Sequence, residues 1–522
     1  MAKICLCLSS KTIERNLDIL NKYRKHVDLA ELRVDCLDPD ERFLIRRFPE
    51  RAGLPVILAI RRDIDGGCFT GGDGGRGNLM AKGLAYAEVD RRRNFAYLDI
   101  EEDLHVPSLE EAARAFGTRI IRSYHNTKGT DDNLSAKINS IRHSPGEIVK
   151  VVMTANNTKD VLNLLRAGRE YMKQDKILIA AGHYGVYSRI LAEQFGSSMS
   201  YASALSESDV FPAAPGQMDV QELATVYRFR NITKDTKVFG VVGFPLNVTS
   251  SPPFFNAVFE SEGNDAVYVP FPADSITEFM KIAHELDVEG VSVTVPYKEA
   301  VIPFLYHQTD EVRTIGACNT LSRCPQGWMG SNTDAKGFSD SLLSFIKTPK
   351  LKRKRVTIIG AGGVARAVAF ELYNQGAKVL ILNRTVHKAR RLAIPYKFEW
   401  GGLDDRDIEK MEKYNDIIIQ ATSVGMENFG SHDTAGSSES SYLLDPVSMY
   451  NFSGKEEVID LVYKPEITVL LRRAANAGCR VLNGYDMLIR QARYQYTQVS
   501  GKEFPEHLLS RGHFWQTLHE GI

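Results

Sequence analysis

The feature that most constrains the fold is an alternation that fills the first 225 residues. Short apolar runs alternate there with longer segments of helical periodicity. The eight runs are ICLCLS, LAELRVD, LPVILAIR, FAYLDIE, RIIRSYH, IVKVVMTA, ILIAAG and MSYASA. Near-continuous apolar runs are typical of parallel strands that are buried on both faces, and helices between them make βα units. Eight units predict an α/β fold that begins with a (β/α)8 TIM barrel, with an open flavodoxin-like sheet as the alternative.

One of these runs carries a lysine in its middle. Lys150 interrupts EIVKVVMTA, although lysine is rarely buried. An edge strand, or a side chain that reaches out to water, would explain it. The other explanation is a lysine that is kept dry and neutral so that it attacks a carbonyl group.

Polar residues near the ends of the other strands favour the second explanation. Active sites of barrels lie at the carboxyl ends of the strands. The residues expected there are Glu31, Arg33, Arg61, His125, Arg189 and Gln217. We therefore predict a pocket at this rim, with Lys150 as its nucleophile.

A chain of 522 residues is too long for one hydrophobic core, so several domains are expected. The polar segment around YRFRNITKDTK separates the barrel from two further α/β patterns. The predicted parts are a barrel over residues 1–226, a linker over 227–236, a substrate-binding lobe over 237–340 and 475–522, and a Rossmann lobe over 341–474. The helical stretch from Tyr485 to His519 is expected to return to the substrate-binding lobe.

The bulk composition excludes several classes of protein. A formal net charge of zero, with 25% charged residues, argues against a nucleic-acid partner. No apolar stretch is long enough to span a membrane, and the first residues enter a strand without a secretory signal. The seven cysteines contain no CxxC pair, so we expect neither disulfides nor a metal site. We expect a cytoplasmic enzyme with no obligate protein partner.

A glycine-rich turn in the third pattern predicts a dinucleotide site. VTIIGAGGVARA is a buried strand that runs into Gly360-x-Gly362-Gly363-x-Ala365 and then a helix. Glycines let a pyrophosphate approach the backbone, and the free N–H groups of the helix N-terminus bind it.

The residues after the next strand indicate which dinucleotide binds. NAD sites place a carboxylate about 20 residues after the glycines, whereas this chain has Asn383, Arg384 and Thr385. Lys388 adds a second cation. These residues favour the 2′-phosphate of NADP(H), although a surface arginine in a turn is the alternative.

A lysine and an aspartate in the second pattern suggest a proton relay. Lys298 ends VTVPYK and Asp334 ends SNTD. Reduction of a ketone requires a proton for the new alkoxide, which a lysine held by an aspartate can deliver. A surface lysine and a turn aspartate are the alternative. The polar residues expected to bind a polyhydroxylated acid are Thr249, Ser251, Thr294, Asn319, Tyr463 and Gln491.

Together these motifs resemble the family of type I 3-dehydroquinate dehydratases fused to shikimate dehydrogenases, as in plants. In the first half the family's motifs appear as Glu31-Leu-Arg33-Val-Asp35, Arg61 to Asp65-Gly66-Gly67, SYH with His125, the strand lysine Lys150, SR with Arg189, and Ala214 to Gln217. The resemblance implies that Lys150 forms an imine with the substrate ketone, that His125 transfers protons and that Arg189 binds the carboxylate. The residues implied to hold ring hydroxyls are Glu31, Arg33, Arg61 and Gln217. Asp65 replaces the family's glutamate and is shorter, so its contact with His125 is expected to be slack.

In the second half the resemblance is to shikimate dehydrogenase, through VTVPYK, GACNT, NTD, GAGGVAR, NRT, ATSVGM, DLVYKP and NGYDMLIRQA. It implies that Lys298 and Asp334 are catalytic and that the six polar residues above bind substrate. The residues implied to bind NADP(H) are Gly360, Ala361, Gly362, Gly363, Val364, Asn383, Arg384, Thr385, Lys388, Thr422, Gly484 and Met487. The implied reactions convert 3-dehydroquinate to 3-dehydroshikimate, and then 3-dehydroshikimate to shikimate with NADPH.

Three alternatives compete with this interpretation. A class I aldolase also uses a strand lysine, but it does not explain Arg33, Arg61, Arg189 and Gln217 together. A metabolite-sensing regulator that has lost catalysis would be expected to lack the lysines or the relay acid. Thr249 adds a methyl group where the substrate carboxylate is expected, so the second half could prefer quinate to shikimate.

Overall fold

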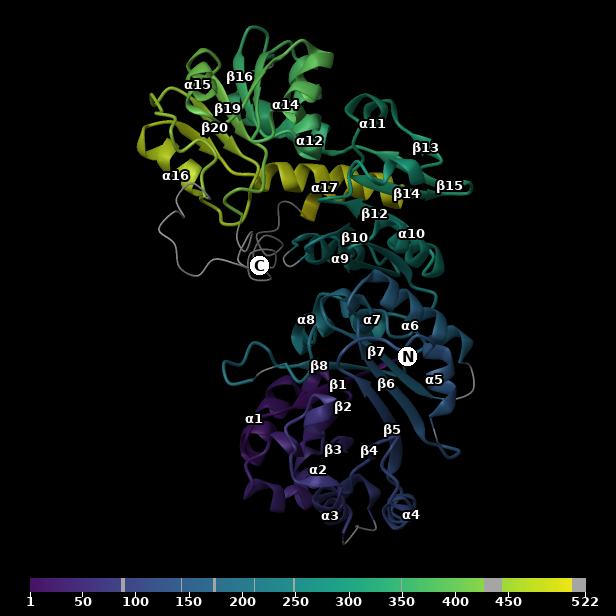
Figure 1. The fold of residues 1–522 in the computed structure, drawn as a ribbon. Coiled ribbons are helices and arrows are strands. Elements are labelled where there is room, and N and C mark those ends of the chain that lie inside the picture. Colours follow the sequence, from purple (N-terminus) through teal and green to yellow (C-terminus); the bar gives the residue numbers. More distant parts are fainter. Residues whose placement is uncertain are drawn as a thin grey trace. The chain divides into compact units, whose positions relative to one another are not determined.

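The computed structural model describes the chain except residues 86–89, 142, 172–174, 211, 247–248, 349, 427–443 and 509–522. The described residues form two compact units (Figure 1), residues 1–289 with 507–508, and residues 290–506. In neither unit does a described helix have the length and apolar character needed to cross a membrane.

The first unit begins with the predicted barrel. Its strands are β1 (Lys3–Leu8), β2 (Leu29–Arg33), β3 (Val56–Ala59), β4 (Tyr97–Glu101), β5 (Arg119–Asn126), β6 (Ile148–Thr154), β7 (Lys176–Ala181) and β8 (Met199–Ser203). They pair in parallel in the order β7-β6-β5-β4-β3-β2-β1-β8, and the short β9 (Met218–Asp219) extends the sheet beside β8. All eight strands lie where the apolar runs predict them.

Helices follow the strands on the outside of the sheet. They are α1 (Ile13–Tyr23), α2 (Phe48–Ala52), α3 (Gly72–Leu84), α4 (Pro107–Ala115), α5 (Leu134–Ser140), α6 (Thr158–Glu170), α7 (Val186–Ile190) and α8 (Val220–Thr225). Side-chain oxygens of Thr12, Asn133 and Asn157 cap α1, α5 and α6 by accepting from backbone N–H groups of their first turns. Such caps satisfy donors that a helix leaves without partners.

Three serine residues in the segments between β7 and β8 bind backbone polar groups of β7. The N–H of Ser198 donates to the carbonyl of Lys176 at 2.8 Å. Two other N–H groups of β7, those of Leu178 and Ala180, donate to the hydroxyls of Ser197 and Ser188 at 3.1 and 3.2 Å. Buried backbone groups of β7 therefore find hydrogen-bond partners in the segments that follow this strand.

Apolar side chains fill the interior of the barrel below its polar rim. Buried residues from several strands make this core, namely Cys5, Cys7, Leu29, Ile57, Ile121, Ile148, Ile177, Ile179, Met199 and Tyr201. A filled interior leaves only the rim for a ligand, as is usual for this fold.

The rest of the first unit is a parallel pair of strands with two helices. β10 (Lys237–Gly243) pairs with β11 (Ala266–Pro272), and α9 (Ser251–Ser261) and α10 (Ile276–Glu285) follow them. Asp274 joins this part to the barrel, because it accepts from the N–H and the hydroxyl of Thr158 at 2.9 and 2.5 Å. Within the predicted linker, the guanidinium of Arg228 donates to the carbonyl of Ala266 at 3.0 Å.

The second unit contains a small, mainly antiparallel sheet. The boundary between the units falls within β12 (Val288–Val293), which pairs with β14 (Thr320–Cys324). β14 pairs with β15 (Gly327–Ser331), and β13 (His307–Gln308) runs parallel to β15.

The long helix α17 (Tyr485–Ser500) packs on this sheet (Figure 1). The hydroxyl of Ser292 donates to the Gln495 side chain at 2.9 Å, and that of Ser322 donates to the Gln498 carbonyl at 2.8 Å. The helical stretch predicted up to His519 is described only to residue 508; its remainder lies outside the described residues.

A six-stranded parallel sheet completes the second unit. Its strands are β16 (Arg355–Ile359), β17 (Lys378–Leu382), β18 (Glu399–Gly401), β19 (Ile417–Gln420), β20 (Glu457–Asp460) and β21 (Arg480–Leu482). The order β18-β17-β16-β19-β20-β21 is that of a dinucleotide-binding Rossmann fold. Because β17 and β19 flank β16, the ends of these strands mark the switch point where such folds bind their ligand.

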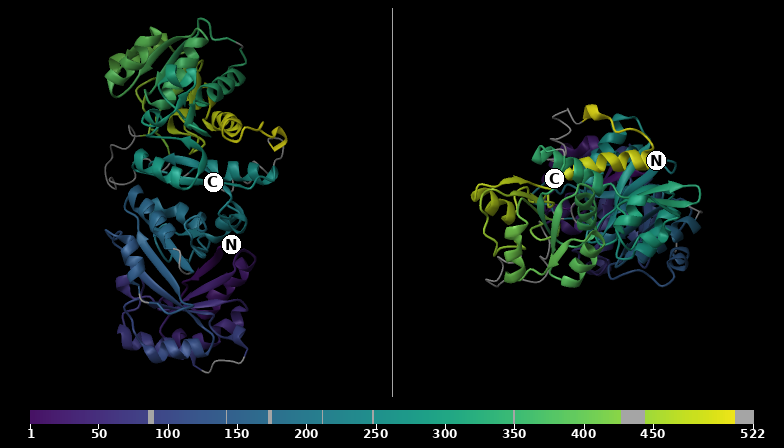
Figure 2. Two further views of the ribbon diagram at one scale, coloured as in Figure 1. Left: turned by 90° about the vertical axis from the view of Figure 1, so that its right-hand side faces the viewer. Right: turned by 90° about the horizontal axis from the view of Figure 1, so that it is seen from above.

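Helices cover both faces of the Rossmann sheet (Figure 2). On one face α12 (Asp334–Ile346), α13 (Gly363–Asn374) and α14 (Val386–Ala393) pack on Ile358 and Ile381. On the other face α15 (Asp405–Glu409) and α16 (Val469–Asn476) pack on Ile359 and Leu380. Neighbouring strand residues thus point to opposite faces, and both faces are buried, which explains the continuous apolar runs.

Candidate active sites

A cavity of about 340 Å³ lies at the carboxyl ends of the barrel strands. All eight residues predicted for the dehydratase pocket line it, namely Glu31, Arg33, Arg61, Asp65, His125, Lys150, Arg189 and Gln217. The fold therefore brings together residues that are spread over 187 positions of the sequence, from 31 to 217.

Lys150 lies at the centre of this group. It points into the barrel from β6, as do Val152 and Thr154, and only 3% of its surface is exposed. Its Nζ lies 2.8 Å from a carboxylate oxygen of Asp99 and 3.3 Å from one of Glu31. The ring of Tyr201 completes this environment, with its centroid 4.3 Å from the same nitrogen.

The charge state of Lys150 differs from the prediction. Burial alone would lower the pKa of this amine, but the carboxylates of Asp99 and Glu31 outweigh burial and raise the pKa. The prediction of a neutral amine is therefore wrong for the structure described here, because two carboxylates face the nitrogen at ion-pair distance. Lys150 is a buried ammonium group that must lose a proton before it attacks.

His125 has the opposite character. It projects from β5 into the same cavity, two residues beyond Ser123, which is aligned with Lys150 on β6. Burial, together with the charges of Arg61 and Lys150, lowers the pKa of His125 well below its usual value. Its Nδ1 is buried and has no hydrogen-bond partner among the described residues. The imidazole is consequently neutral near pH 7 and is ready to accept a proton.

Asp65 lines the cavity, but a different side chain holds it. Its carboxylate lies 2.5 Å from Nε of Arg62, which also binds Asp103 at 2.9 Å. The short side chain is thus anchored toward Arg62, in keeping with a slack contact to His125.

The three arginines of the cavity differ in their partners. Arg33 makes a bidentate ion pair with Asp35, with distances of 2.9 and 2.7 Å, and Nη2 of Arg61 lies 3.0 Å from a carboxylate oxygen of Asp99. Arg189 has only carbonyl partners among the described residues, those of Tyr201 and Pro215 at 3.4 Å. Burial lowers the pKa of Arg189 to about 10. A buried guanidinium that lacks a carboxylate partner should bind an anionic ligand more strongly than one that is already paired.

Sequence reasoning missed several residues of this site. Asp99 in β4 binds Lys150 and Arg61 at 2.8 and 3.0 Å, and Glu101, two residues further along the strand, binds Arg76 at 2.6 Å. The sequence could have indicated both residues, because each is a charged residue within an apolar run, as Lys150 is. Cys7 and Tyr201 gave no such signal, because both are ordinary residues of buried strands.

The predicted relay of the second unit is assembled. Nζ of Lys298 lies 2.5 Å from one carboxylate oxygen of Asp334, and Nδ2 of Asn319 donates to the other at 2.9 Å. The side chain of Gln491 in α17 accepts from the same Asn319 nitrogen at 3.4 Å. All four side chains are buried. Lysine, aspartate and two amides thus form one polar network.

The other predicted substrate residues are less closely tied to this network. Thr294 follows β12, and Tyr463 follows β20, and both are partly buried. Thr249 and Ser251 lie in the first unit at the start of α9, where the N–H of Ser251 donates to the Thr249 hydroxyl at 3.3 Å. Their arrangement around Lys298 remains a prediction.

The glycine-rich turn after β16 has the geometry that its sequence predicts. Gly360 has a φ of +118°, and a Cβ there would lie 2.9 Å from the carbonyl oxygen of Ala421. Gly362 has open space where a side chain would be, and a Cβ on Gly363 would lie 3.1 Å from the stem of Lys298. The turn is therefore accessible to a ligand at Gly362, and Gly363 lets it approach the side chain of Lys298 closely.

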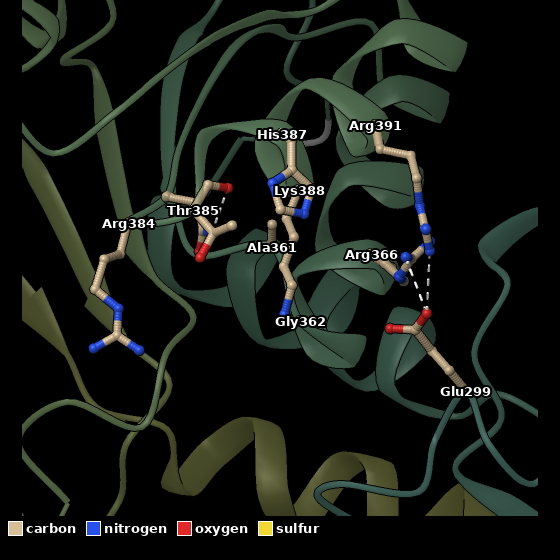
Figure 3. A pocket seen from close by; sticks show the side chains of 10 residues that line it. Glu299, Ala361, Gly362, Arg366, Arg384, Thr385, His387, Lys388 and Arg391 are labelled. Carbon is tan, nitrogen blue, oxygen red and sulfur yellow. Dashed lines mark hydrogen bonds and ion pairs between the residues drawn. The ribbon is translucent and has the colours of Figure 1, made fainter.

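A second cavity of about 340 Å³ lies beside this turn (Figure 3). It is lined by Glu299, Ala361, Gly362, Arg366, Asn383, Arg384, Thr385, His387, Lys388 and Arg391. Six of the predicted cofactor residues are among them. Its four arginine and lysine side chains suit a ligand with several phosphates.

Glu299 is the acidic member of this cavity. Its carboxylate lies 3.1 Å from Arg366 and 3.6 Å from Arg391, and Figure 3 shows it facing both guanidinium groups, which lie next to each other. Sequence reasoning found none of these three residues, because they meet only when α13, α14 and the Lys298 segment pack together.

The remaining cofactor predictions lie outside this cavity. They are Gly360, Gly363, Val364, Thr422, Gly484 and Met487. The first two shape the turn itself, as described above. Gly484 is packed against the carbonyl of Leu461, where no side chain would fit, and Met487 is buried in the first turn of α17.

Family models match three stretches of the chain. Residues 4–234 match type I 3-dehydroquinase, residues 241–321 match the shikimate dehydrogenase substrate binding domain, and residues 343–440 match shikimate / quinate 5-dehydrogenase.

Curated relatives and a solved structure are similar over the same stretches. The bifunctional 3-dehydroquinate dehydratase/shikimate dehydrogenase, chloroplastic, of Arabidopsis thaliana is 28% identical over 99% of this chain and 84% of its own length. The shikimate dehydrogenase (NADP(+)) of Aquifex aeolicus is 35% identical over 54% of this chain and 97% of its own. The dehydroquinate dehydratase and shikimate dehydrogenase structure from S. pombe is 24% identical, covers 99% of this chain and 98% of its own, and has a TM-score of 0.42. With a type I 3-dehydroquinase domain followed by both domains of shikimate dehydrogenase, the chain belongs to the bifunctional 3-dehydroquinate dehydratase/shikimate dehydrogenase family.

Proposed function

We propose that the barrel dehydrates 3-dehydroquinate to 3-dehydroshikimate and that the second half reduces this product to shikimate with NADPH. The observation that carries the proposal is the content of the barrel cavity. A buried lysine, a neutral imidazole and a buried guanidinium all line it, and this guanidinium has no carboxylate partner among the described residues. These three groups suit imine formation, proton transfer and binding of a substrate carboxylate.

The first step requires a neutral amine at Lys150. Asp99 and Glu31 lie 2.8 and 3.3 Å from Nζ, so either carboxylate is placed to accept its proton. The amine then attacks the ring ketone, and loss of water from the adduct leaves a protonated imine. The same two carboxylates stabilise this cation, which gives the ion pairs a role both before and after the bond forms.

His125 is the proposed general base and acid for the elimination. The neutral imidazole removes a proton from the carbon next to the imine, and the electron pair moves to the imine nitrogen. The resulting enamine expels the hydroxyl group one carbon further on, which leaves as water with the proton from His125. Hydrolysis of the remaining imine releases 3-dehydroshikimate and returns Lys150 as an amine.

Arginines and amides are proposed to orient the ring. Arg189 binds the substrate carboxylate, since it has no carboxylate within the described protein. The residues proposed to hold the hydroxyl groups are Glu31, Arg33, Arg61 and Gln217, with Asp65 supporting the loop near His125. The side chain of Gln217 is kept in position by the N–H of Ala213, which donates to its side-chain oxygen at 2.8 Å.

In the second half, Lys298 and Asp334 are proposed to deliver the proton for reduction. NADPH, when bound, would supply the hydride for the ketone carbon. Lys298 donates a proton to the oxygen, and the Asp334 carboxylate, 2.5 Å away, holds the ammonium in place. Asn319 and Gln491 keep Asp334 oriented and, with Thr249, Ser251, Thr294 and Tyr463, are proposed to bind the substrate's polar groups.

The cofactor is NADP(H), and the cavity beside Gly362 fits it. Arg384, Thr385 and Lys388 are proposed to bind the 2′-phosphate, and the N-terminus of α13 the pyrophosphate. Asn383 supports this loop, since its side chain donates to the Thr385 carbonyl at 2.9 Å. The proposed cofactor residues beyond these are Gly360, Ala361, Gly363, Val364, Thr422, Gly484 and Met487.

We propose the same domain boundaries as the sequence suggests, at 1–226, 227–236, 237–340 with 475–522, and 341–474. The return of α17 to β12 and β14 supports the discontinuous substrate-binding lobe. The cytoplasm is the proposed compartment, which seven free cysteines support.

Two assays with the full chain test the proposal. With 3-dehydroquinate and NADPH, the wild-type protein is expected to produce shikimate, and borohydride is expected to trap substrate on Lys150. Lys150→Ala should lose both trapping and dehydration but should still oxidise shikimate with NADP⁺. If borohydride still traps substrate on this variant, another residue is the nucleophile. Parallel kinetics with quinate measure the preference of the second half.

A further inference from the structure

Three side chains that commonly bind metals meet beside the barrel cavity. Asp35 and Cys36 follow β2, and Cys68 lies in the loop before α3. One carboxylate oxygen of Asp35 and the sulfurs of Cys36 and Cys68 all lie within 4.8 Å of one another. The two cysteines are far apart in the sequence and form no recognisable motif, so only the fold brings them together.

We propose that Asp35, Cys36 and Cys68 bind a thiophilic divalent cation such as Zn²⁺, and that this cation inhibits the dehydratase. The inhibition rests on the proposed dehydratase function, whereas the binding does not.

The ligand set suits zinc in number, type and access. Two sulfurs and one carboxylate oxygen supply three of the four ligands of a tetrahedral site. Zinc–sulfur bonds are about 2.3 Å long, so two coordinated sulfurs lie roughly 3.8 Å apart, within the observed limit. Cys68 is exposed and Cys36 partly so, which leaves room for entry of the ion and for water as the fourth ligand.

The charges around the site also favour a dication. On binding, both thiols release a proton to solvent. The two thiolates and Asp35, balanced in part by Arg33, then leave a charge that one divalent cation neutralises.

Asp35 connects the site to the dehydratase cavity. Its two carboxylate oxygens accept hydrogen bonds from Nε and Nη2 of Arg33, at 2.9 and 2.7 Å, and Arg33 lines the cavity. The N–H of Cys68 donates to Oδ2 of Asp35, the oxygen that accepts from Nη2 of Arg33, at 3.1 Å. A cation that coordinates this oxygen weakens its hydrogen bond to Arg33. The guanidinium of Arg33 is then no longer fixed in one orientation toward a ligand in the cavity.

Binding is tested directly on the full-length protein. Equilibrium dialysis with Zn²⁺, and Co²⁺ titration followed by thiolate-to-metal charge-transfer absorption, should reveal a site with thiolate ligands in the wild type. Cys36→Ser and Cys68→Ser should each lose the absorption band and bind about a hundredfold more weakly. Cys324→Ser is the matched control, because Cys324 is also partly exposed but lies in the second unit.

Activity measurements test the consequence separately. Zn²⁺ should slow dehydration by the wild type, and a chelator should restore it, while Cys68→Ser should keep its activity in the same Zn²⁺. Shikimate oxidation, measured in the same samples, should be unaffected. The absence of a thiolate band, or a band that persists in both serine variants, would overturn the site. A band without selective inhibition would overturn only the link to Arg33, and a wild type inactive without metal would instead count against the dehydratase proposal.

Discussion

Nζ of Lys150 lies 2.8 Å from a carboxylate oxygen of Asp99 inside the barrel. The same oxygen of Asp99 also accepts from Arg61 at 3.0 Å, and its other oxygen accepts from the Ser123 hydroxyl at 2.5 Å. Lys150 and Arg61 outweigh the effect of burial and hold the pKa of Asp99 well below its usual range. The proposed nucleophile is therefore kept as a positioned ammonium group, and its activation is a proton transfer rather than a permanent loss of charge.

Replacing Asp99 with asparagine should lower the pKa of Lys150. The carboxylate raises that pKa against burial, so its removal lets burial dominate and favours the neutral amine at lower pH. The pH midpoint for labelling of Lys150 by a neutral amine-reactive reagent should therefore fall. Dehydration should nevertheless become slower, because the protonated imine loses a counter-ion. Asp103→Asn, which removes an exposed carboxylate bound to Arg62, is the control, and an unchanged midpoint in Asp99→Asn would contradict the assignment.

Replacement by leucine should destabilise the protein strongly at one buried arginine, Arg122, and only slightly at another, Arg189. Arg189 has no carboxylate partner among the described residues, whereas Arg122 binds Glu110 and Glu147 at 3.4 and 3.3 Å. Arg122→Leu leaves two buried carboxylates without their cation and should cost about 3–5 kcal/mol of unfolding free energy in urea. Arg189→Leu removes an unpaired buried charge and should change stability by no more than about 1 kcal/mol.

The same Arg189→Leu variant should lose dehydratase efficiency. Loss of the charged partner of a substrate carboxylate should lower kcat/KM by roughly 2–4 kcal/mol, which is about thirtyfold to a thousandfold. Shikimate oxidation in the same protein is the internal control. A variant that is strongly destabilised, or that keeps its affinity for 3-dehydroquinate, would show that Arg189 has a structural role instead.

The barrel was predictable because its strands are buried on both faces. Each of the eight runs is apolar along most of its length, so the strands could be predicted without the structure, and the charged residues that interrupt the runs, such as Lys150, stood out. What could not be read is how the charges inside the barrel pair. The prediction of a neutral amine failed because it considered burial alone, and Asp99 was read only as part of an apolar run.

The cofactor site shows a similar limit. The glycine turn and the basic loop at Arg384 each form within one βα unit, so local sequence predicts them. Arg366, Arg391 and Glu299 come from two helices and a separate loop, and their meeting depends on tertiary packing. The cluster of Asp35, Cys36 and Cys68 was hidden for the same reason, since no spacing rule relates residues on different loops.

Replacing Arg384 with glutamine should change the choice of cofactor. Its side chain lines the cavity beside Thr385 and Lys388, and no acidic residue stands at its position in the turn. The variant should bind NADPH about tenfold or more weakly, because it loses a charge-assisted contact to the 2′-phosphate. Binding of NADH, measured by fluorescence titration, should change little. Equal losses for both cofactors would refute a role in binding the 2′-phosphate.

Glu299 already occupies part of the cavity that phosphates are proposed to enter. Its carboxylate pairs with Arg366 at 3.1 Å, and Nε of Arg366 is buried with no partner among the described residues. An incoming phosphate group and this carboxylate therefore compete for the same guanidinium. Glu299 also directly follows Lys298, so the competition involves the segment that carries the proposed proton donor.

Glu299→Gln should bind NADPH more tightly than the wild type. The substitution removes a negative charge from a cavity that is proposed to bind negatively charged phosphates, and it frees Arg366 to bind the ligand. We therefore expect the binding free energy of NADPH to become more favourable by about 1 kcal/mol, which lowers Kd roughly fivefold. The gain should shrink at high salt, because the pair is partly exposed and is screened. Glu311→Gln removes an exposed carboxylate in the same unit and should leave Kd unchanged. Weaker binding by Glu299→Gln would mean that Glu299 instead positions Arg366 for the cofactor.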